Sequence, residues 1–314
     1  MKKTLLALAV VAASGAAFAQ TATLSGNLTT GFQQNKVAGA KTSGFGVDTA
    51  EFFLTTTEDL GGGLKASAKI GLGGLTRDGD GTGRDSALTL AGGFGTIVLT
   101  TFESDDGLAR ARPGPSWGLD GKVHAANSNI DLIGYTSPQL APGLTVGINY
   151  VDRGTTVGTG LAAGTSGPAS AQPSSTANVS YKAGPIDARL DGTVWTRQLA
   201  ADVTSNTNKN RFRVSGSYDL GVAKLGLGYY QLKRTSGTTY KETVAGVSVP
   251  LGAATLGLVY EAVNNNNVKT TGFSLGAQYD LSKRTNVQAG LRQWKTKGAD
   301  STNSSFHIVA SHSF

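Results

Sequence analysis

Apolar and polar positions alternate along almost the whole chain after residue 20, and this alternation predicts a succession of β-strands. In the first predicted strand, Leu24 and Leu28 fall on one face while Thr23 and Asn27 fall on the other. A strand needs this period of two when it separates an apolar from an aqueous environment. The same pattern recurs in residues 253–263 and 286–292. The abundance of Gly, Thr, Ser and Val is also typical of strands and turns.

The predicted strands are joined alternately by tight turns and by longer polar segments. The tight turns fall at residues 58–63, 92–95, 137–142, 183–185, 219–221, 250–252 and 280–283. The longer segments are residues 33–44, 75–83, 103–127, 153–174, 197–209, 234–239, 264–268 and 296–303. These seven turns and eight loops separate about sixteen strands.

This arrangement favours an all-β fold, a 16-stranded antiparallel transmembrane β-barrel. Outer-membrane barrels have an even number of strands, with short turns on one rim and longer loops on the other, and their membrane strands are ~10 residues long. A soluble β-sandwich also has alternating strands, with turns every ~8 to 12 residues, and is the alternative interpretation. The regular change between tight and long connections favours the barrel.

The last predicted strand supports a closed sheet. Phe306, Ile308, Ala310, His312 and Phe314 alternate up to the terminal aromatic residue. Chain ends normally fray, so an aromatic residue in register at the end indicates that this end is tied into the sheet. Pairing the first strand with the sixteenth removes both edges, which lipid would leave unsatisfied.

The first nineteen residues have the features of a secretory signal peptide. Lys2 and Lys3 precede an apolar run at residues 4–13, and Ala17 and Ala19 form a small-residue cleavage site. We expect cleavage after Ala19, so that residues 20–314 form the barrel domain. The apolar run is too short to span a ~30 Å hydrocarbon core as a helix, and no later window has ~18 consecutive apolar residues. Any crossing of a membrane is therefore expected to use strands.

Composition excludes several other classes of protein. The chain has no cysteine, so it has neither disulfides nor a cysteine-based zinc or redox site. The formal charge is +7, of which the predicted signal peptide carries two positive charges. The remaining surplus is spread along the chain without a basic run, so nucleic acid is not an expected partner.

Four short motifs give the chain a specific resemblance. They are TEDLGGGLK at residues 57–65, GGFGT at 92–96, YTSP at 135–138 and HSF at 312–314. With them, the whole chain resembles the trimeric general porins of Gram-negative bacteria, especially those of beta-proteobacteria. The resemblance implies a homotrimer in the cell outer membrane, in contact with lipopolysaccharide and outer-membrane lipid. It also implies a water-filled barrel for small hydrophilic solutes and ions, whose third external loop folds inward and narrows the pore.

Residues 103–127 are the segment that matches this inward loop. The segment follows the fifth predicted strand and is the only long connection that combines charges of both signs with Trp117 and prolines. A constriction with acidic groups facing basic groups carries a transverse field that sorts solutes by charge and size. The candidate acidic residues are Glu103, Asp105, Asp106 and Asp120, and the candidate basic residues are Arg110, Arg112 and Lys122. The alternative is that these charges only solvate a surface loop.

The barrel wall departs from the family pattern. The resemblance implies lumenal arginines on the second, fourth and sixth strands, but the corresponding positions Glu51, Thr55 and Gly134 are not basic. Only Arg84 matches.

Two lysines add positive charge to the predicted wall. Lys65 and Lys69 alternate with apolar residues and are predicted to point into the lumen, either to restore positive field or as ordinary solvated wall residues. From the net charge we expect a mild preference for anions.

An Asp- and Gly-rich stretch at residues 78–85 is similar to a calcium-binding loop. It lacks a bidentate Glu at the twelfth position, and Arg84 would repel the ion. A turn explains it more simply, so we predict no metal site and no cofactor.

Three functions remain to be compared. Passive diffusion needs no further chemistry. A solute-specific channel would need a ladder of basic or aromatic side chains, and Trp117, Tyr230 and Trp294 are scattered in the sequence. An enzyme would need a histidine with a supporting acid, and of the three histidines only His124 lies in the inward loop, with no partner evident in the sequence. We therefore predict a diffusion pore and no enzyme.

Overall fold

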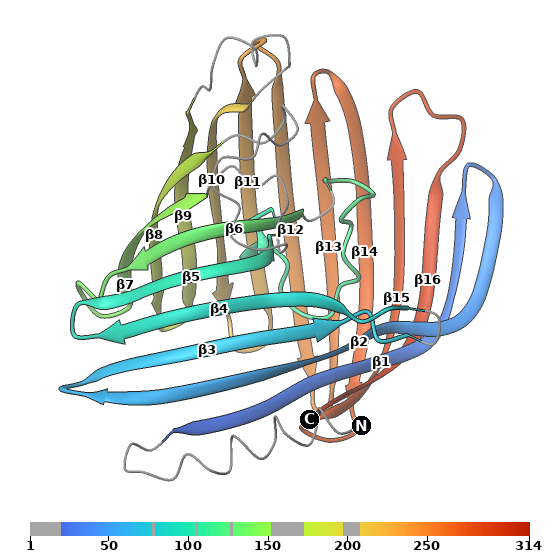
Figure 1. The fold of residues 1–314 in the computed structure, drawn as a ribbon. Coiled ribbons are helices and arrows are strands. Elements are labelled where there is room, and N and C mark those ends of the chain that lie inside the picture. The colour runs from blue at the N-terminus through green and yellow to red at the C-terminus, as the bar shows by residue number, and fades with distance from the viewer. Residues whose placement is uncertain (1–19, 77–78, 105, 126–127, 152–172, 197–207) are drawn as a thin grey trace.

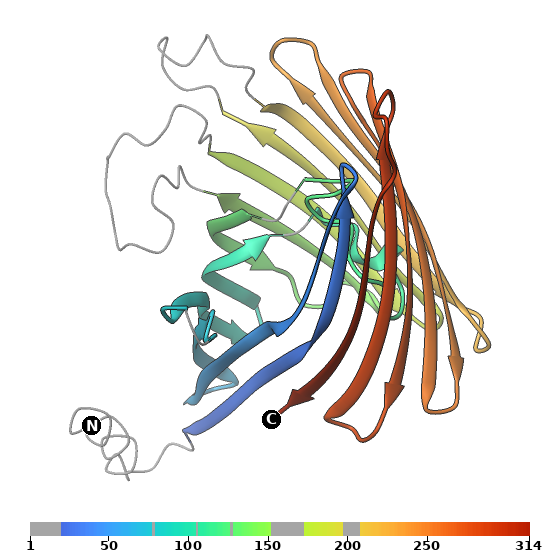
Figure 2. The ribbon, with the colours of Figure 1, turned by 90° about the vertical axis from the view of Figure 1, so that its right-hand side faces the viewer.

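A computed structural model describes residues 20–76, 79–104, 106–125, 128–151, 173–196 and 208–314 of the protein. The predicted signal peptide, Asp105 and most of the predicted loops 153–174 and 197–209 lie outside the described residues. Figures 1 and 2 show two views of the chain at right angles.

Sixteen strands form one closed antiparallel barrel, as the sequence predicts. They are β1 (Thr21–Val37), β2 (Ala40–Gly61), β3 (Leu64–Gly73), β4 (Thr82–Gly92), β5 (Gly95–Ser104), β6 (Ser128–Thr136), β7 (Leu144–Val151), β8 (Ser174–Ala183), β9 (Ile186–Trp195), β10 (Asn208–Asp219), β11 (Lys224–Arg234), β12 (Thr239–Leu251), β13 (Ala254–Asn265), β14 (Val268–Asp280), β15 (Thr285–Thr296) and β16 (Asn303–Ser313). The barrel closes where β1 pairs with β16, from Asn27 opposite Ser313 to Lys36 opposite Ser304.

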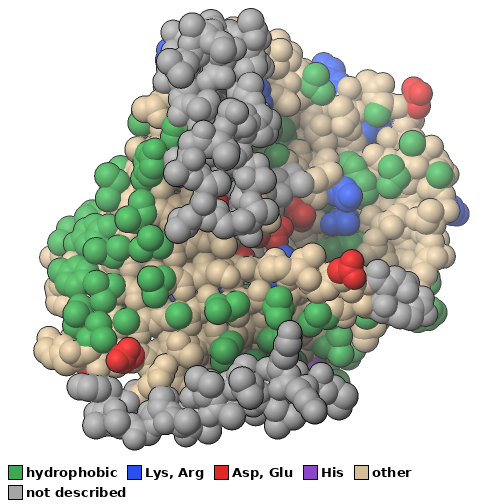
Figure 3. Space-filling model, viewed as in Figure 1, with side chains coloured by type: hydrophobic (Ala, Val, Ile, Leu, Met, Phe, Trp, Pro, Cys, Tyr) green, Lys and Arg blue, Asp and Glu red, His purple; other side chains and the backbone are tan. Residues whose placement is uncertain are grey.

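The alternation in the sequence becomes an apolar outer face and a polar inner face. On β13, Leu256, Leu258 and Tyr260 are exposed on the outside, whereas Val259 and Glu261 are buried on the inside. Figure 3 shows hydrophobic side chains spread over the outer face on the left of the view, and charged side chains gathered in the central hollow. Among the described residues, no helix is long and apolar enough to cross a membrane. An apolar outer band is what hydrocarbon requires of a barrel strand.

Two of the predicted long loops are shorter than predicted. Within residues 33–44, β1 and β2 stay paired as far as Val37 opposite Ala40, so the connection is only Ala38 and Gly39. Within residues 264–268, β13 and β14 are joined by Asn266 and Asn267, both with positive φ, at 49° and 70°. Two-residue hairpins favour such left-handed residues. Polar composition misled the prediction, because a strand that extends into water is as polar as a loop.

Residues 106–125, between β5 and β6, run inside the barrel and contain the short 3-10 helix η1 (Ala109–Ala111). We call residues 103–127 the inward loop. It packs against the inner wall through two small apolar clusters, the only ones among the described residues. The first contains Leu108, Ala111, Val244 and Val259, and the second contains Leu119, Val123, Val263 and Trp294.

Glycines on the wall let the inward loop approach the strands closely. A Cβ atom added at Gly276 on β14 would lie 1.7 Å from the carbonyl oxygen of Pro115. A Cβ at Gly246 on β12 would lie 2.4 Å from the carbonyl oxygen of Ala111. The backbone of the loop therefore rests on positions where no side chain fits.

Replacing Gly276 by Ala is expected to destabilise the folded barrel by about 1–3 kcal/mol, because the loop must move away from an overpacked wall. The measurement is the midpoint of urea unfolding of the refolded barrel. Gly192→Ala is the matched control, since a Cβ at Gly192 on β9 meets nothing within 4 Å. Equal midpoints for the two variants would contradict the close contact between the loop and the wall.

Candidate functional site

The start of the inward loop is tied to β9 and β10. Arg110 forms an ion pair with Asp187, with 2.5 Å between Nε and Oδ1. Arg213 donates from Nη1 to the carbonyl oxygen of Asp106 at 3.0 Å, and Ser215 donates from Oγ to the carbonyl oxygen of Gly107 at 3.3 Å. Bonds from the wall to backbone carbonyls fix the path of the loop as well as the position of its side chains.

Arg112 is the central anchor of the inward loop. Its guanidinium binds both carboxylate oxygens of Asp106, at 3.0 and 2.5 Å. The same group donates to Oε1 of Glu242 at 3.0 Å and to Oε1 of Glu261 at 2.5 Å. The Glu242 and Glu261 side chains are only 1% exposed. One cation thus joins two positions of the loop to strands β12 and β13.

The pKa values of the two loop residues reflect this pairing. Burial alone would raise the pKa of the Asp106 carboxyl, but the hydrogen bonds and the charge of Arg112 outweigh it and hold that pKa below its usual range. Burial alone would lower the pKa of Arg112, but the surrounding carboxylates raise it. Both groups therefore stay charged at neutral pH, as a salt bridge requires.

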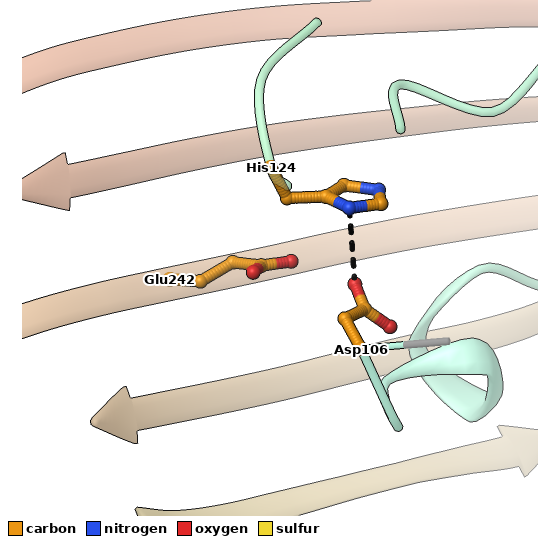
Figure 4. A group of neighbouring side chains, drawn as sticks. All are labelled: Asp106, His124 and Glu242. Atoms are coloured by element: carbon orange, nitrogen blue, oxygen red, sulfur yellow. Dashed lines mark ion pairs between the residues drawn. The ribbon is translucent and has the colours of Figure 1, made fainter. Parts of the chain in front are cut away.

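His124 lies beside this anchor (Figure 4). Its Nδ1 is 3.8 Å from Oδ2 of Asp106, and its Nε2 is 3.6 Å from Oε2 of Glu261. The sequence shows no partner for His124, because Glu261 belongs to a strand that is distant in the chain. Ligand atoms of Asp106, His124 and Glu242 lie within 4.8 Å of one another, a grouping that could hold a metal ion. Arg112, however, already supplies a cation to both of these carboxylates.

The far end of the inward loop is held by stacking. The Trp117 ring lies on the His307 ring of β16, with 3.9 Å between centroids and 14° between planes. The Arg292 guanidinium of β15 lies 3.7 Å from the Trp117 centroid, and its Nη1 donates to the carbonyl oxygen of Gly118 at 2.5 Å. His307 thus also faces the lumen, beside the inward loop.

Arg84 and Glu103 come together away from these anchors. Arg84 Nε lies 2.9 Å from Oε2 of Glu51 on β2, and Nη1 lies 3.2 Å from Oε2 of Glu103 at the end of β5. These side chains are 17% to 40% exposed. Glu51, a position where the family resemblance led us to look for arginine, instead provides a partner for the arginine of β4.

The remaining predicted site residues are more open. Lys69 lies on the inner face of β3 with Nζ 4.1 Å above the Phe53 ring centroid, and Lys65 is exposed on the same strand. Asp120 and Lys122 are exposed on the inward loop. The structure therefore gathers Asp106, Arg112 and His124 at one anchor and leaves the other charges spread around the lumen. Their part in a constriction stays a prediction.

Several lumenal residues were missed in the sequence. They are Asp187, Arg189 and Asp191 on β9, Arg211 and Arg213 on β10, Glu242 on β12, and Arg292 on β15. A usable signal was present, since Arg211 and Arg213 flank Phe212 in strict alternation, as the inner face of a barrel strand predicts. The alternation does not predict which of these charged side chains contact the inward loop.

The fold is a closed β-barrel with the inward loop packed against its inner wall. The profile of the family described as Gram-negative porin matches residues 5–299. The chain is 32% identical over 333 residues to outer membrane porin protein 32 of Delftia acidovorans, covering 95% of this chain and 91% of that protein.

Solved structures share the barrel fold of this chain. The anion-selective porin from Comamonas acidovorans superimposes with a TM-score of 0.72 at 24% identity, over 94% of this chain and 100% of that one. The trimer form of in-vitro folded OmpT from Vibrio cholerae superimposes with a TM-score of 0.69 at 16% identity, with the same coverage.

The chain therefore belongs to the Gram-negative porin family. It is an outer-membrane porin, and its barrel forms a water-filled channel for the passive diffusion of small hydrophilic solutes and ions.

Replacing Arg112 by Gln is expected to destabilise the protein by about 3–5 kcal/mol, because it leaves three neighbouring carboxyl groups without their cation. Urea unfolding midpoints measure this loss, and increased noise of the open-channel current is expected to report the loosened loop. Arg110→Gln, which breaks a more exposed pair, is the matched control and should cost about 1 kcal/mol or less.

Changing Glu242 and Glu261 to Gln together with Arg112 should recover part of the stability, since the uncompensated charge is then removed. If the triple variant is as unstable as Arg112→Gln alone, the stabilising effect of Arg112 does not come from balancing the charge of Glu242 and Glu261.

Proposed function

We propose that the protein works as a homotrimer of diffusion pores in which the inward loop narrows each lumen and a surplus of arginine favours anions mildly. The main support for the mild preference for anions is that two arginines on β9 and β10 share a single carboxylate. Asp191 Oδ1 lies 2.8 Å from Nε of Arg213, and Asp191 Oδ2 lies 3.5 Å from Nε of Arg189. Arg211 forms no ion pair with any residue that the structure describes.

A second set of positive side chains lies on β3, where Lys65 and Lys69 make no ion pair within the described part of the chain. Positive potential in a narrow, water-filled path raises the local concentration of anions. The name of the Comamonas relative, an anion-selective porin, agrees with this direction. Asp105, Asp106, Asp120 and Glu103 oppose it, and the pairing of Asp106 with Arg112 and of Glu103 with Arg84 weakens that opposition.

A diffusion pore fits the geometry better than an enzyme. His124, within the inward loop, is only 7% exposed, and its neighbours Asp106 and Glu261 are both bonded to Arg112. A general base needs to reach a substrate, and a side chain this buried is poorly placed to do so. We also infer that residues 1–19 act as a signal peptide, removed on export.

Reversal potentials in a KCl gradient test the proposed selectivity. Wild-type channels should favour chloride over potassium by a small factor, and Arg189→Gln should reduce that factor, because it removes one of two arginines that share Asp191. Arg284→Gln removes the same charge at the tight turn between β14 and β15, outside the lumen, and serves as the control. A cation-preferring wild type, or equal shifts for both variants, would contradict the assignment of selectivity to the inner wall.

The homotrimer is tested by mass measurement of the detergent-solubilised protein before and after heating. We expect a particle of three chains that dissociates to monomers on heating. The trimer form known for OmpT of Vibrio cholerae supports this expectation. A monomeric mass before heating, together with normal conductance, would remove the trimer from the proposal and keep the pore.

A further inference from the structure

Three consecutive strands place an arginine between two aromatic rings on the lumenal wall. The Arg211 guanidinium carbon on β10 lies 5.3 Å from the Trp195 ring centroid on β9 and 5.9 Å from the Tyr230 ring centroid on β11. All three side chains are half-buried. Trp195 is the last residue of β9, so the group lies where the wall leads into a long connection. We call these three residues the arginine–aromatic site.

Arg211 lacks a counter-ion within the described residues. Its Nη2 donates to the hydroxyl oxygen of Thr193 at 2.9 Å, and its buried Nε has no hydrogen-bond partner. The nearby carboxylate, Asp191, accepts from Arg213 and Arg189 instead. The guanidinium therefore keeps a full positive charge and donor capacity that the described protein groups do not use.

Arg292 differs from Arg211 in that it bonds directly to the inward loop. Arg292 also lies over a tryptophan, but its Nη1 bonds to the carbonyl oxygen of Gly118, and it is 8% exposed. Arg292 thus serves the loop anchor. In the arginine–aromatic site, Tyr230 packs against the apolar cluster that contains Leu108 and Ala111 of the inward loop. Arg211 itself donates to Thr193 on β9, and its charge stays available to a solute.

We propose that the arginine–aromatic site binds aromatic carboxylates and makes them preferred solutes of the channel, a proposal that rests on the pore function. The carboxylate takes the free N–H groups of Arg211, since a guanidinium fork matches the two oxygens of a carboxylate. The aromatic ring of the solute packs on the faces of Trp195 and Tyr230, or on the guanidinium plane.

Other solute classes fit this site less well. Inorganic anions use the charge of Arg211 but gain nothing from the two rings. Aliphatic carboxylates use the fork and gain only contact area. Aromatic cations gain the ring contacts but meet the repulsion of Arg211, Arg213 and Arg189, with one shared aspartate among them. Only a planar ring that carries an anionic group uses both features of the site.

The test is block of the single-channel KCl current by benzoate and by cyclohexanecarboxylate, which have the same charge and nearly the same size. We expect benzoate to block at about 3- to 10-fold lower concentration, the factor typical of aromatic and cation–π contacts. In Trp195→Leu this ratio should approach one, and in Arg211→Gln block by both carboxylates should weaken about tenfold or more.

Arg189→Gln is the matched control. It removes a positive charge from β9, the strand that carries Trp195, and leaves both rings of the site in place. It should weaken both blockers together and keep their ratio. Equal block by the two carboxylates in wild-type channels that conduct KCl normally would overturn this inference and leave the pore function standing. Absence of KCl conductance would overturn both. If Arg211→Gln fails to fold, the ratio in the wild type and in Trp195→Leu still decides.

Discussion

The bonds that Arg112 makes to Asp106, Glu242 and Glu261 are the constraint on which the inside of this barrel depends. Taking an arginine and three carboxyl groups out of water is costly, and good geometry has to repay that cost. The structure provides such geometry, because the Arg112 guanidinium lies 2.5 to 3.0 Å from carboxylate oxygens of all three acids. Because two of the acids belong to the rigid sheet, the loop can be held in one position only.

The anchor works together with the apolar contacts on either side of it. Leu108 and Ala111 pack on Val244 and Val259 before the arginine, and Leu119 and Val123 pack on Val263 and Trp294 after it. A barrel with a wet lumen has no continuous core, so these clusters stabilise only the loop against the wall. Glycines such as Gly276 allow the contact by removing side chains from its path. Sterics, burial and charge thus agree on one placement of the loop.

The strands could be predicted because alternation is a local signal. Each lipid-facing Leu or Tyr repeats two residues along, and Phe314 exchanges backbone hydrogen bonds with Gly26 where the sheet closes. The inward loop could be located by its charges, but its partners could not. Arg112 and Glu261 are 149 residues apart, and the register of the strands between them decides that they meet. The lengths of the connections at Ala38 and Asn266 were predicted wrongly for a different reason, since solvated strands and loops share polar composition.

The distribution of unpaired charge inside the barrel depends on which arginines the carboxylates pair with. From the sequence, residues 103–127 are predicted to supply the acidic side of a filter. Asp106 instead neutralises the loop's own Arg112, and Glu103 meets Arg84 on the neighbouring strand. Basic side chains left without acids lie on the wall, with Arg211 the clearest case. A channel can therefore favour anions although its inward loop carries several carboxylates, because a paired carboxylate contributes little field to the path of a solute.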